Sequence, residues 1–108
     1  LLKLIESVVK VKVSERVKNY ILDIVARVRS FDEVSSGPGP RASIWLLKGS
    51  RALAFLEGRD YVIPDDVKKL AYHVLPHRIK VKLEYQADNI SPLSIVEKAL
   101  KEVEVPKY

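Results

Sequence analysis

The stretch GPGPRAS at residues 37–43, followed by a largely apolar run at residues 44–56, decides how this chain folds. Two Gly-Pro pairs make a stiff loop, and Pro40 stands in the first turn of a helix, where its missing N–H costs nothing. Arg41 is therefore expected on the opening turn of a helix over residues 40–57. A helix start presents free N–H groups and partial positive charge, so an arginine there suits an anion such as a phosphate. A solvated arginine at an ordinary helix start is the alternative.

The apolar residues of this helix surround most of its axis, which is typical of a central, buried helix. We therefore expect Trp45 and Phe55 to lie in the middle of a bundle, and Trp45→Ala to cost about 3–5 kcal/mol of stability. Stacking of Trp45 on Arg41 is the alternative, because the two residues are one turn apart. The cations Arg41, Lys48 and Arg51 fall within one narrow stripe of the helix.

Apolar residues at helical spacing predict three further helices, over residues 15–30, 64–75 and 92–105. Ser14 is a good N-cap for the first of them, and Ser91 for the last. The helix that begins at residue 64 opens on a proline, which is favoured in a first turn.

The remaining segments are expected to be short. Residues 11–13 form a connector or a tiny strand, and the alternation of apolar residues over 78–85 predicts a strand. Residues 1–10 carry a helical stripe with no capping residue before it, which suggests that the chain is a piece of a longer protein. The predicted fold class is all-α, a small helical bundle with at most a minor two-stranded element.

The composition is that of one folded domain of 108 residues, 1–108. Hydrophobic residues make up 47% and charged residues 31%, which is typical of a globular chain. The absence of cysteine excludes a disulfide framework and thiolate metal ligands. No apolar run has membrane-spanning length and no signal-peptide pattern appears, so we expect a cytoplasmic protein with no membrane partner.

Catalytic and metal motifs are absent from the sequence. It contains no Gly-rich P-loop, no nucleophile elbow and no zinc motif. His73 and His77 have the i, i+4 spacing of metal ligands, but Pro76 between them should break the helix, so no metal site is expected. Asp65 and Asp66 are adjacent and point in different directions, and their place in the first turn of a helix explains them by the helix dipole.

The formal net charge is +5, and the densest basic cluster lies at residues 77–82. Such a cluster can contact the phosphates of nucleic acid, so a basic helical nucleic-acid-binding module is the alternative function. Basic and acidic residues are otherwise interspersed, as on a solvated surface, and we do not expect nucleic acid as a partner. Binding of duplex DNA with a steep salt dependence would favour the alternative.

Four pieces of sequence follow one another: GPGPRAS at 37–43, RALA at 51–54, GRDYVIPDDV at 58–67 and VLPHR at 74–78. Their order and spacing resemble the C-terminal lid of a MoxR-type AAA+ ATPase, over residues 14–106. The resemblance implies a helical lid domain preceded by an α/β ATPase core, which is missing from this chain. One departure is Ile63, where the family commonly has a hydroxyl residue that caps the next helix.

The resemblance assigns Arg41 to the sensor-2 position, which reaches the γ-phosphate of the nucleotide. Its neighbours Pro40 and Ala42 complete the expected cofactor-binding residues. ATP with Mg²⁺ would be bound mainly by the missing core, so the parent protein is expected to hydrolyse ATP and this chain alone is not. The implied function is coupling of ATP hydrolysis to lid movement in a chaperone-like remodelling or maturation machine. The implied partners are the protein's own core, neighbouring subunits of a ring, and von Willebrand factor A domain proteins.

Overall fold

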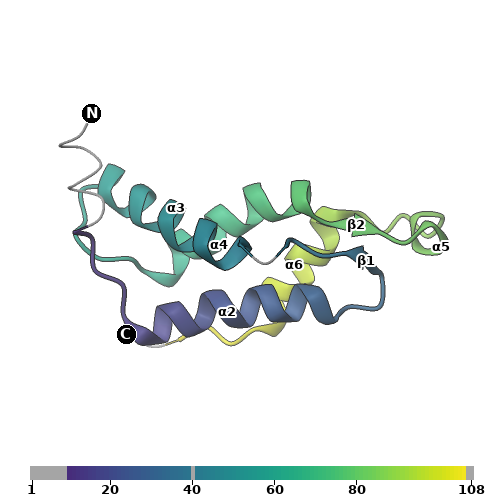
Figure 1. Cartoon of the computed structure of the whole chain (residues 1–108), viewed down its shortest axis with the longest axis horizontal. Helices are drawn as coiled ribbons and strands as arrows, with labels where there is room; N and C mark the ends of the chain where they lie inside the picture. Colours follow the sequence, from purple (N-terminus) through teal and green to yellow (C-terminus); the bar gives the residue numbers. More distant parts are fainter. Residues whose placement is uncertain (1–9, 40, 107–108) are drawn as a thin grey trace.

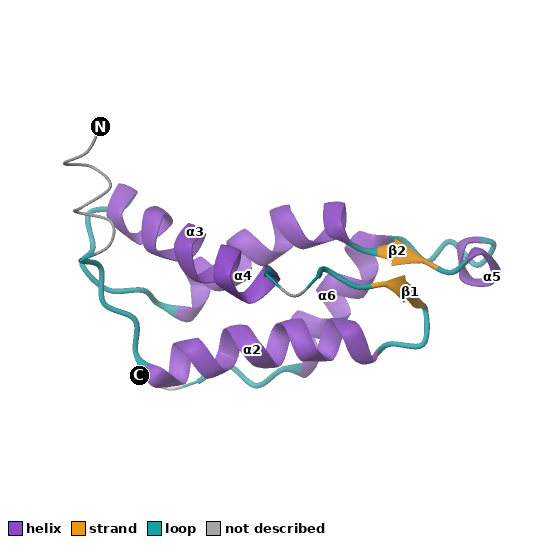
Figure 2. Cartoon of the chain, in the orientation of Figure 1, coloured by secondary structure: helices purple, strands orange, loops and turns teal. Residues whose placement is uncertain are grey.

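The computed structural model describes residues 10–39 and 41–106, which form a helical bundle with a small sheet (Figures 1 and 2). In chain order the elements are α2 (Glu15–Ser30), β1 (Val34–Ser36), α3 (Ala42–Leu56), α4 (Pro64–Val74), η1 (Leu75–Arg78), β2 (Lys80–Val81), α5 (Leu83–Gln86) and α6 (Pro92–Glu102). The predicted all-α class with a minor two-stranded element is confirmed. The helix expected over residues 1–10 falls, up to residue 9, outside the described residues.

Helix α2 begins and ends where the sequence predicted. The Ser14 hydroxyl oxygen accepts a hydrogen bond from the N–H of Val17 at 3.2 Å, which caps the first turn. The buried side of the helix is the predicted apolar stripe. Its members are Val17, Tyr20, Ile21, Ile24, Val25 and Val28.

Helix α3 is not the central, fully buried helix that the sequence predicted. Its buried residues are Ala42, Leu46, Ser50 and Ala54. Trp45 is 41% exposed, so its predicted burial is wrong, and Phe55 is only partly buried against the core. Helix α3 packs against α2 and α4, whereas α6 packs against α2, α4 and η1. Among the described elements, α2 and α4 make the main contacts with α3, and Ile44, Trp45 and Leu56 on its remaining surface are exposed.

We expect Trp45→Ala to lower the free energy of unfolding by only about 1 kcal/mol, because much of the ring is already in contact with water. The matched control is Leu46→Ala at the next position, which removes a side chain that is 1% exposed and should cost about 3 kcal/mol. Urea unfolding followed by circular dichroism measures both losses. Equal losses for the two variants would contradict this placement of the tryptophan.

The alternating segment over residues 78–85 forms less strand than predicted. Strand β1 pairs antiparallel with β2, and Val34 lies opposite Val81. Ile79 and Val81 are buried, as the alternation predicted, but the chain then turns into the short helix α5, where Leu83 is 82% exposed. Because β1 has only three residues, the pairing ends early, and α5 lies at a tip that extends away from the helices (Figure 1).

The segment over residues 11–13 is a connector, which was one of its two predicted states, and it carries an isolated bridge instead of a strand. Lys12 forms a parallel bridge with Tyr61. The N–H of Lys12 donates to the carbonyl of Asp60 at 2.8 Å, and the N–H of Val62 donates to the carbonyl of Lys12 at 2.9 Å. These bonds fasten the segment before α2 to the link between α3 and α4.

Candidate functional site

Arg41 lies at the start of α3, but the helix begins at Ala42 instead of the predicted residue 40, so Arg41 precedes the first turn. It is the N-cap residue, with φ −96° and ψ 3°, and its exposed side chain makes no capping hydrogen bond. Its carbonyl accepts the N–H of Trp45 at 3.1 Å. Ala42 is 1% exposed and contributes only backbone to this surface, and its N–H donates to the carbonyl of Gly39 at a long 3.4 Å. Pro40 lies outside the described residues.

The loop that precedes α3 is fastened to the last turn of α2. Arg29 of α2 donates a hydrogen bond from Nη2 to the carbonyl oxygen of Gly39. Pro38 is buried, and a Cβ added at Gly37 would lie 3.1 Å from the Cγ of Arg29. Gly39 has φ +89°, a conformation that favours glycine. The backbone of residues 37–39 is therefore held against the end of α2.

The start of α3 has the character of an anion site. Its first turn contains no acidic residue, and within the described part of the chain the Arg41 guanidinium forms no ion pair. A helix N-terminus carries partial positive charge, and a guanidinium beside it can donate two parallel hydrogen bonds to a phosphate or carboxylate. The described residues at this position therefore fit a phosphate group.

A second arginine contacts the same end of α3. The Cζ atom of Arg78, the last residue of η1, lies 4.6 Å from the centroid of the Trp45 ring. Neither predicted environment of Trp45, the core or a stack on Arg41, includes this contact. The sequence showed Arg78 only as a member of the basic cluster at 77–82. It did not indicate that Arg78 contacts α3.

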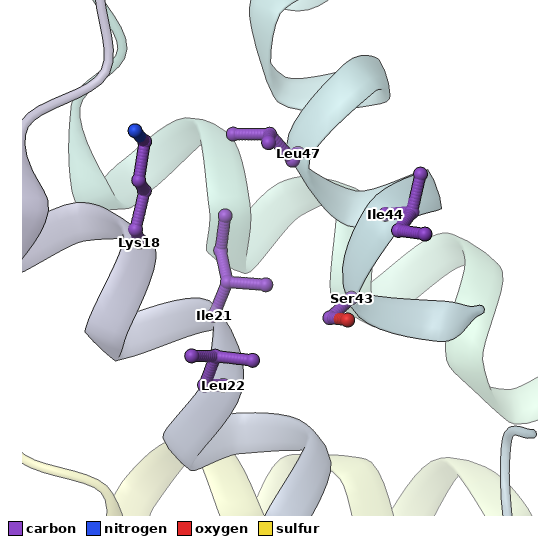
Figure 3. A pocket seen from close by; sticks show the side chains of 6 residues that line it. All are labelled: Lys18, Ile21, Leu22, Ser43, Ile44 and Leu47. Carbon is purple, nitrogen blue, oxygen red and sulfur yellow. The ribbon is translucent and has the colours of Figure 1, made fainter. Parts of the chain in front are cut away.

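An open, apolar pocket of about 200 Å³ lies between α2 and α3, close to the start of α3 (Figure 3). Leu22 of α2 is 54% exposed and Ile44 of α3 is 48% exposed at this surface. Its lining residues are Lys18, Ile21, Leu22, Ser43, Ile44 and Leu47. Grouped, exposed apolar side chains are typical of surfaces that contact another protein or domain.

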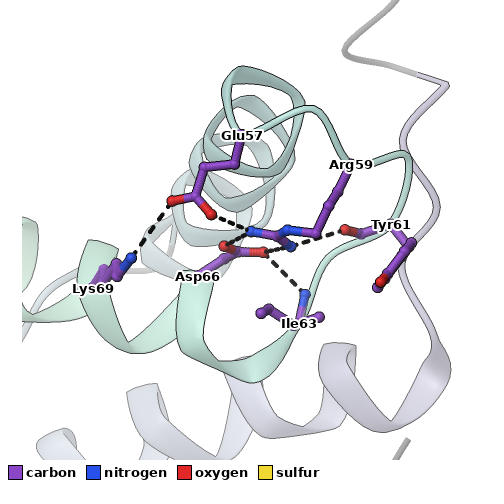
Figure 4. A network of polar contacts seen from close by, with 6 residues as sticks. All are labelled: Glu57, Arg59, Tyr61, Ile63, Asp66 and Lys69. Carbon is purple, nitrogen blue, oxygen red and sulfur yellow. Dashed lines mark hydrogen bonds and ion pairs between the residues drawn. The ribbon is translucent and has the colours of Figure 1, made fainter.

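The link between α3 and α4 carries a polar network centred on Arg59 (Figure 4). Arg59 donates to both carboxylate oxygens of Asp66, at 2.8 Å to Oδ2 and 2.6 Å to Oδ1, and to Glu57 Oε2 at 2.7 Å. Asp66 Oδ2 also accepts the N–H of Ile63 at 3.0 Å, and Lys69 lies 3.5 Å from Glu57 Oε1. Asp66 is 1% exposed, so this network joins the end of α3 to the start of α4.

Asp66 thus does more than complement a helix dipole, which was the predicted role. Burial raises the pKa of Asp66, but the hydrogen bonds from Arg59 and from the N–H of Ile63 outweigh it and leave the pKa below its ordinary value of 3.8. The same contact with Asp66 raises the pKa of Arg59. At the third helical position, the Asp66 carboxylate accepts the N–H of the N-cap residue Ile63, which is the reciprocal half of a capping box. The other half is missing because Ile63 has no hydroxyl to accept the N–H of Asp66, and that N–H donates to the Ile63 carbonyl at 3.0 Å instead.

Residues 10–39 and 41–106 contain neither a metal-binding cluster nor a membrane-spanning helix. No group of three or more His, Cys, Asp or Glu side chains there is arranged to hold a metal ion. His73 instead meets Tyr72 edge to face, with ring centroids 5.5 Å apart. No helix in the same residues is long and apolar enough to cross a membrane.

Comparisons with known proteins identify the family. Residues 27–99 match the family described as AAA lid domain. The chain is 41% identical over 96 residues to the uncharacterized protein YeaC of Bacillus subtilis, which is 89% of this chain and 30% of that protein. It is 40% identical over 74 residues to Chaperone MoxR1 of Mycobacterium tuberculosis, which is 68% of this chain and 20% of that protein.

A solved structure agrees with these sequence matches. A protein of Cytophaga hutchinsonii assigned as an ATPase matches with a TM-score of 0.87 and 33% identity, over 94% of this chain and 34% of that one. The chain therefore spans about a third or less of the length of each of these three proteins. The chain belongs to the AAA lid domain family, as a C-terminal lid of the MoxR-type AAA+ ATPases.

Proposed function

We propose that Arg41 is the sensor-2 arginine of a MoxR-like AAA+ ATPase and couples ATP hydrolysis to movement of the lid. The observation that carries the proposal is an exposed guanidinium, with no ion pair among the described residues, at the N-cap of α3. Arg29 holds the carbonyl of Gly39, two residues before Arg41, on the end of α2. A guanidinium in this position is suited to a phosphate.

The coupling would act through charge. While ATP is bound, Arg41 donates hydrogen bonds to the γ-phosphate oxygens and holds the lid against the core. After hydrolysis and release of phosphate this contact is lost, and the lid is free to rotate. A charge-assisted contact of about 2–3 kcal/mol shifts a two-state balance of this kind roughly 30- to 150-fold.

The core that completes the machine is proposed to lie upstream in a longer protein, in which residues 1–108 are the lid. That core would bind ATP with Mg²⁺, and in this chain Arg41 and the flanking backbone of Pro40 and Ala42 would complete the site. The exposed Leu22 and Ile44 beside Arg41 support a contact surface here, which the core or a neighbouring ring subunit would cover. The similarity to a protein named a chaperone supports a remodelling or maturation role. A cytoplasmic location and von Willebrand factor A domain partners complete the proposal.

The test is a measurement of lid position in the full-length protein by energy transfer between two dyes. The chain has no cysteine, so Leu56→Cys, at an end of α3 where the residue is 77% exposed, gives one labelling site, and the core carries the other. The ATP-bound and ADP-bound wild type should give different distances, and Arg41→Ala should give the ADP distance with both nucleotides. A nucleotide-dependent change that survives Arg41→Ala would refute the coupling role.

A further inference from the structure

Trp45, the one tryptophan in the sequence, is at the surface and in contact with Arg78. It lies one turn after Arg41, and residues four apart on a helix share a face. The guanidinium of Arg78 lies over its ring, with Cζ 4.6 Å from the centroid. The contact with Trp45 therefore places Arg78 of η1 beside the first turns of α3, the end of the helix that Arg41 precedes.

The contact with Trp45 leaves the N–H groups of Arg78 available to donate hydrogen bonds. A cation–π contact uses the face of the ring, while the N–H groups of a guanidinium donate in its own plane. Within the described residues, neither Arg41 nor Arg78 has a carboxylate partner. Both side chains are exposed, Arg41 at the N-cap of α3 and Arg78 over a ring one turn further along, and the first turn of the helix has no acid. Two guanidinium groups can together bind a group of more than one negative charge.

A second arginine–aromatic pair, Arg27 and Phe31, differs from the Arg78–Trp45 pair in how the arginine charge is compensated. Arg27 lies over the Phe31 ring, with Cζ 4.4 Å from the centroid, in a similar arrangement. Arg27, however, donates from Nε to the carboxylate of Glu102 at 2.7 Å, so its charge is compensated inside the domain. Among residues 10–39 and 41–106, Arg78 has no such carboxylate partner, and this distinguishes its pair from the Arg27 pair.

We infer that Arg78 is a second phosphate-binding arginine of the Arg41 site, and that Trp45 is the platform that holds it there. The inference rests on the proposed function, because it takes the terminal phosphate of a nucleoside triphosphate as the anion. Arg41 approaches the phosphate from the helix start, and Arg78 approaches it from η1. Loss of the terminal phosphate then releases two elements of the lid, α3 and η1, instead of one.

The test compares the dissociation constants of ATP and ADP for the full-length protein. Arg78→Ala should raise the ATP value about tenfold or more, as expected for a lost hydrogen bond to a charged group, and should change the ADP value less than about twofold. Arg78→Gln, which keeps most of the side-chain size, should behave in the same way. Arg27→Ala removes an equal charge and an equal stack, and should leave the ATP to ADP ratio unchanged.

Arg41→Ala in the same experiment separates this inference from the proposed function. If Arg41→Ala weakens ATP binding and both Arg78 variants bind ATP as the wild type does, the inference is wrong and the proposed function stands. If the Arg78 variants weaken ATP and ADP binding equally, Arg78 is a structural residue and the inference is wrong. If Arg41→Ala itself leaves the ratio unchanged, the proposed function fails, and the inference fails with it.

Discussion

Asp66→Ala is expected to lower the free energy of unfolding by about 3 kcal/mol, a large part of the stability of a domain of this size. The carboxylate is 1% exposed and accepts two hydrogen bonds from Arg59 and one from the N–H of Ile63. Its removal leaves the Arg59 side chain, 19% exposed, with Glu57 as its remaining carboxylate partner. It also leaves the N–H of Ile63 without its acceptor.

The matched control is Asp65→Ala, which removes an exposed carboxylate from the same turn of α4 and should cost less than about 1 kcal/mol. Urea unfolding of both variants supplies the comparison. Because the pKa of Asp66 is lower in the folded chain than its ordinary 3.8, its contribution is fully present above pH 3.8. It should disappear as the pH falls through the lower folded value. Similar losses for Asp65→Ala and Asp66→Ala would show that the Arg59 network adds little to the free energy of unfolding.

Local signals predicted the elements that depend on neighbours in sequence. Helix α2 was predicted to the residue because Ser14 caps it and its apolar stripe repeats without a break. The left-handed turn after α3 could also be predicted from a local signal, because glycine is the residue type that favours this conformation and Gly58 has φ +80°. In both cases the deciding contacts span only a few residues.

The errors concern contacts between distant segments. An apolar pattern shows which sides of α3 can be buried, but not how many helices are present to bury them, and Trp45 was misplaced for this reason. The alternation at 78–85 correctly predicted two buried residues, but strand length depends on the partner, and β1 is short. The pairing of Arg78 with Trp45 depends on the packing of η1 beside α3, which no local pattern reveals.

The candidate site could be predicted in part. The position of Arg41 next to the start of α3 follows from the loop sequence and is confirmed. The role of Arg41 in binding a phosphate comes from the family resemblance and stays a proposal. The Arg59 network had one local signal, an acid at the third position of α4. Its other half, the reach of Arg59 to Asp66, is a tertiary contact.

Arg41→Ala in the full-length protein is expected to reduce ATP turnover about a hundredfold, the effect typical of removing one donor to a transition-state oxygen. The lid should remain folded, because the side chain is exposed and its loss opens no cavity. Arg41→Lys should restore little of the activity, since an ammonium group cannot replace the two parallel donors of a guanidinium.

Lys48 provides the matched control for charge. It lies on the same stripe of α3 as Arg41, is also exposed, and is about 10 Å further along the helix. Lys48→Ala removes the same formal charge at a distance from the proposed phosphate position. Its effect on turnover is expected to stay within about threefold.

The most direct test of the sensor-2 assignment is therefore the steady-state ATPase rate of the full-length protein at saturating MgATP, measured for Arg41→Ala and Lys48→Ala side by side. Melting curves of both variants establish that each is folded. A rate about a hundredfold lower for Arg41→Ala, with near wild-type turnover for Lys48→Ala, is the predicted result. Wild-type turnover in a folded Arg41→Ala protein would contradict the assignment of Arg41 and the coupling mechanism built on it.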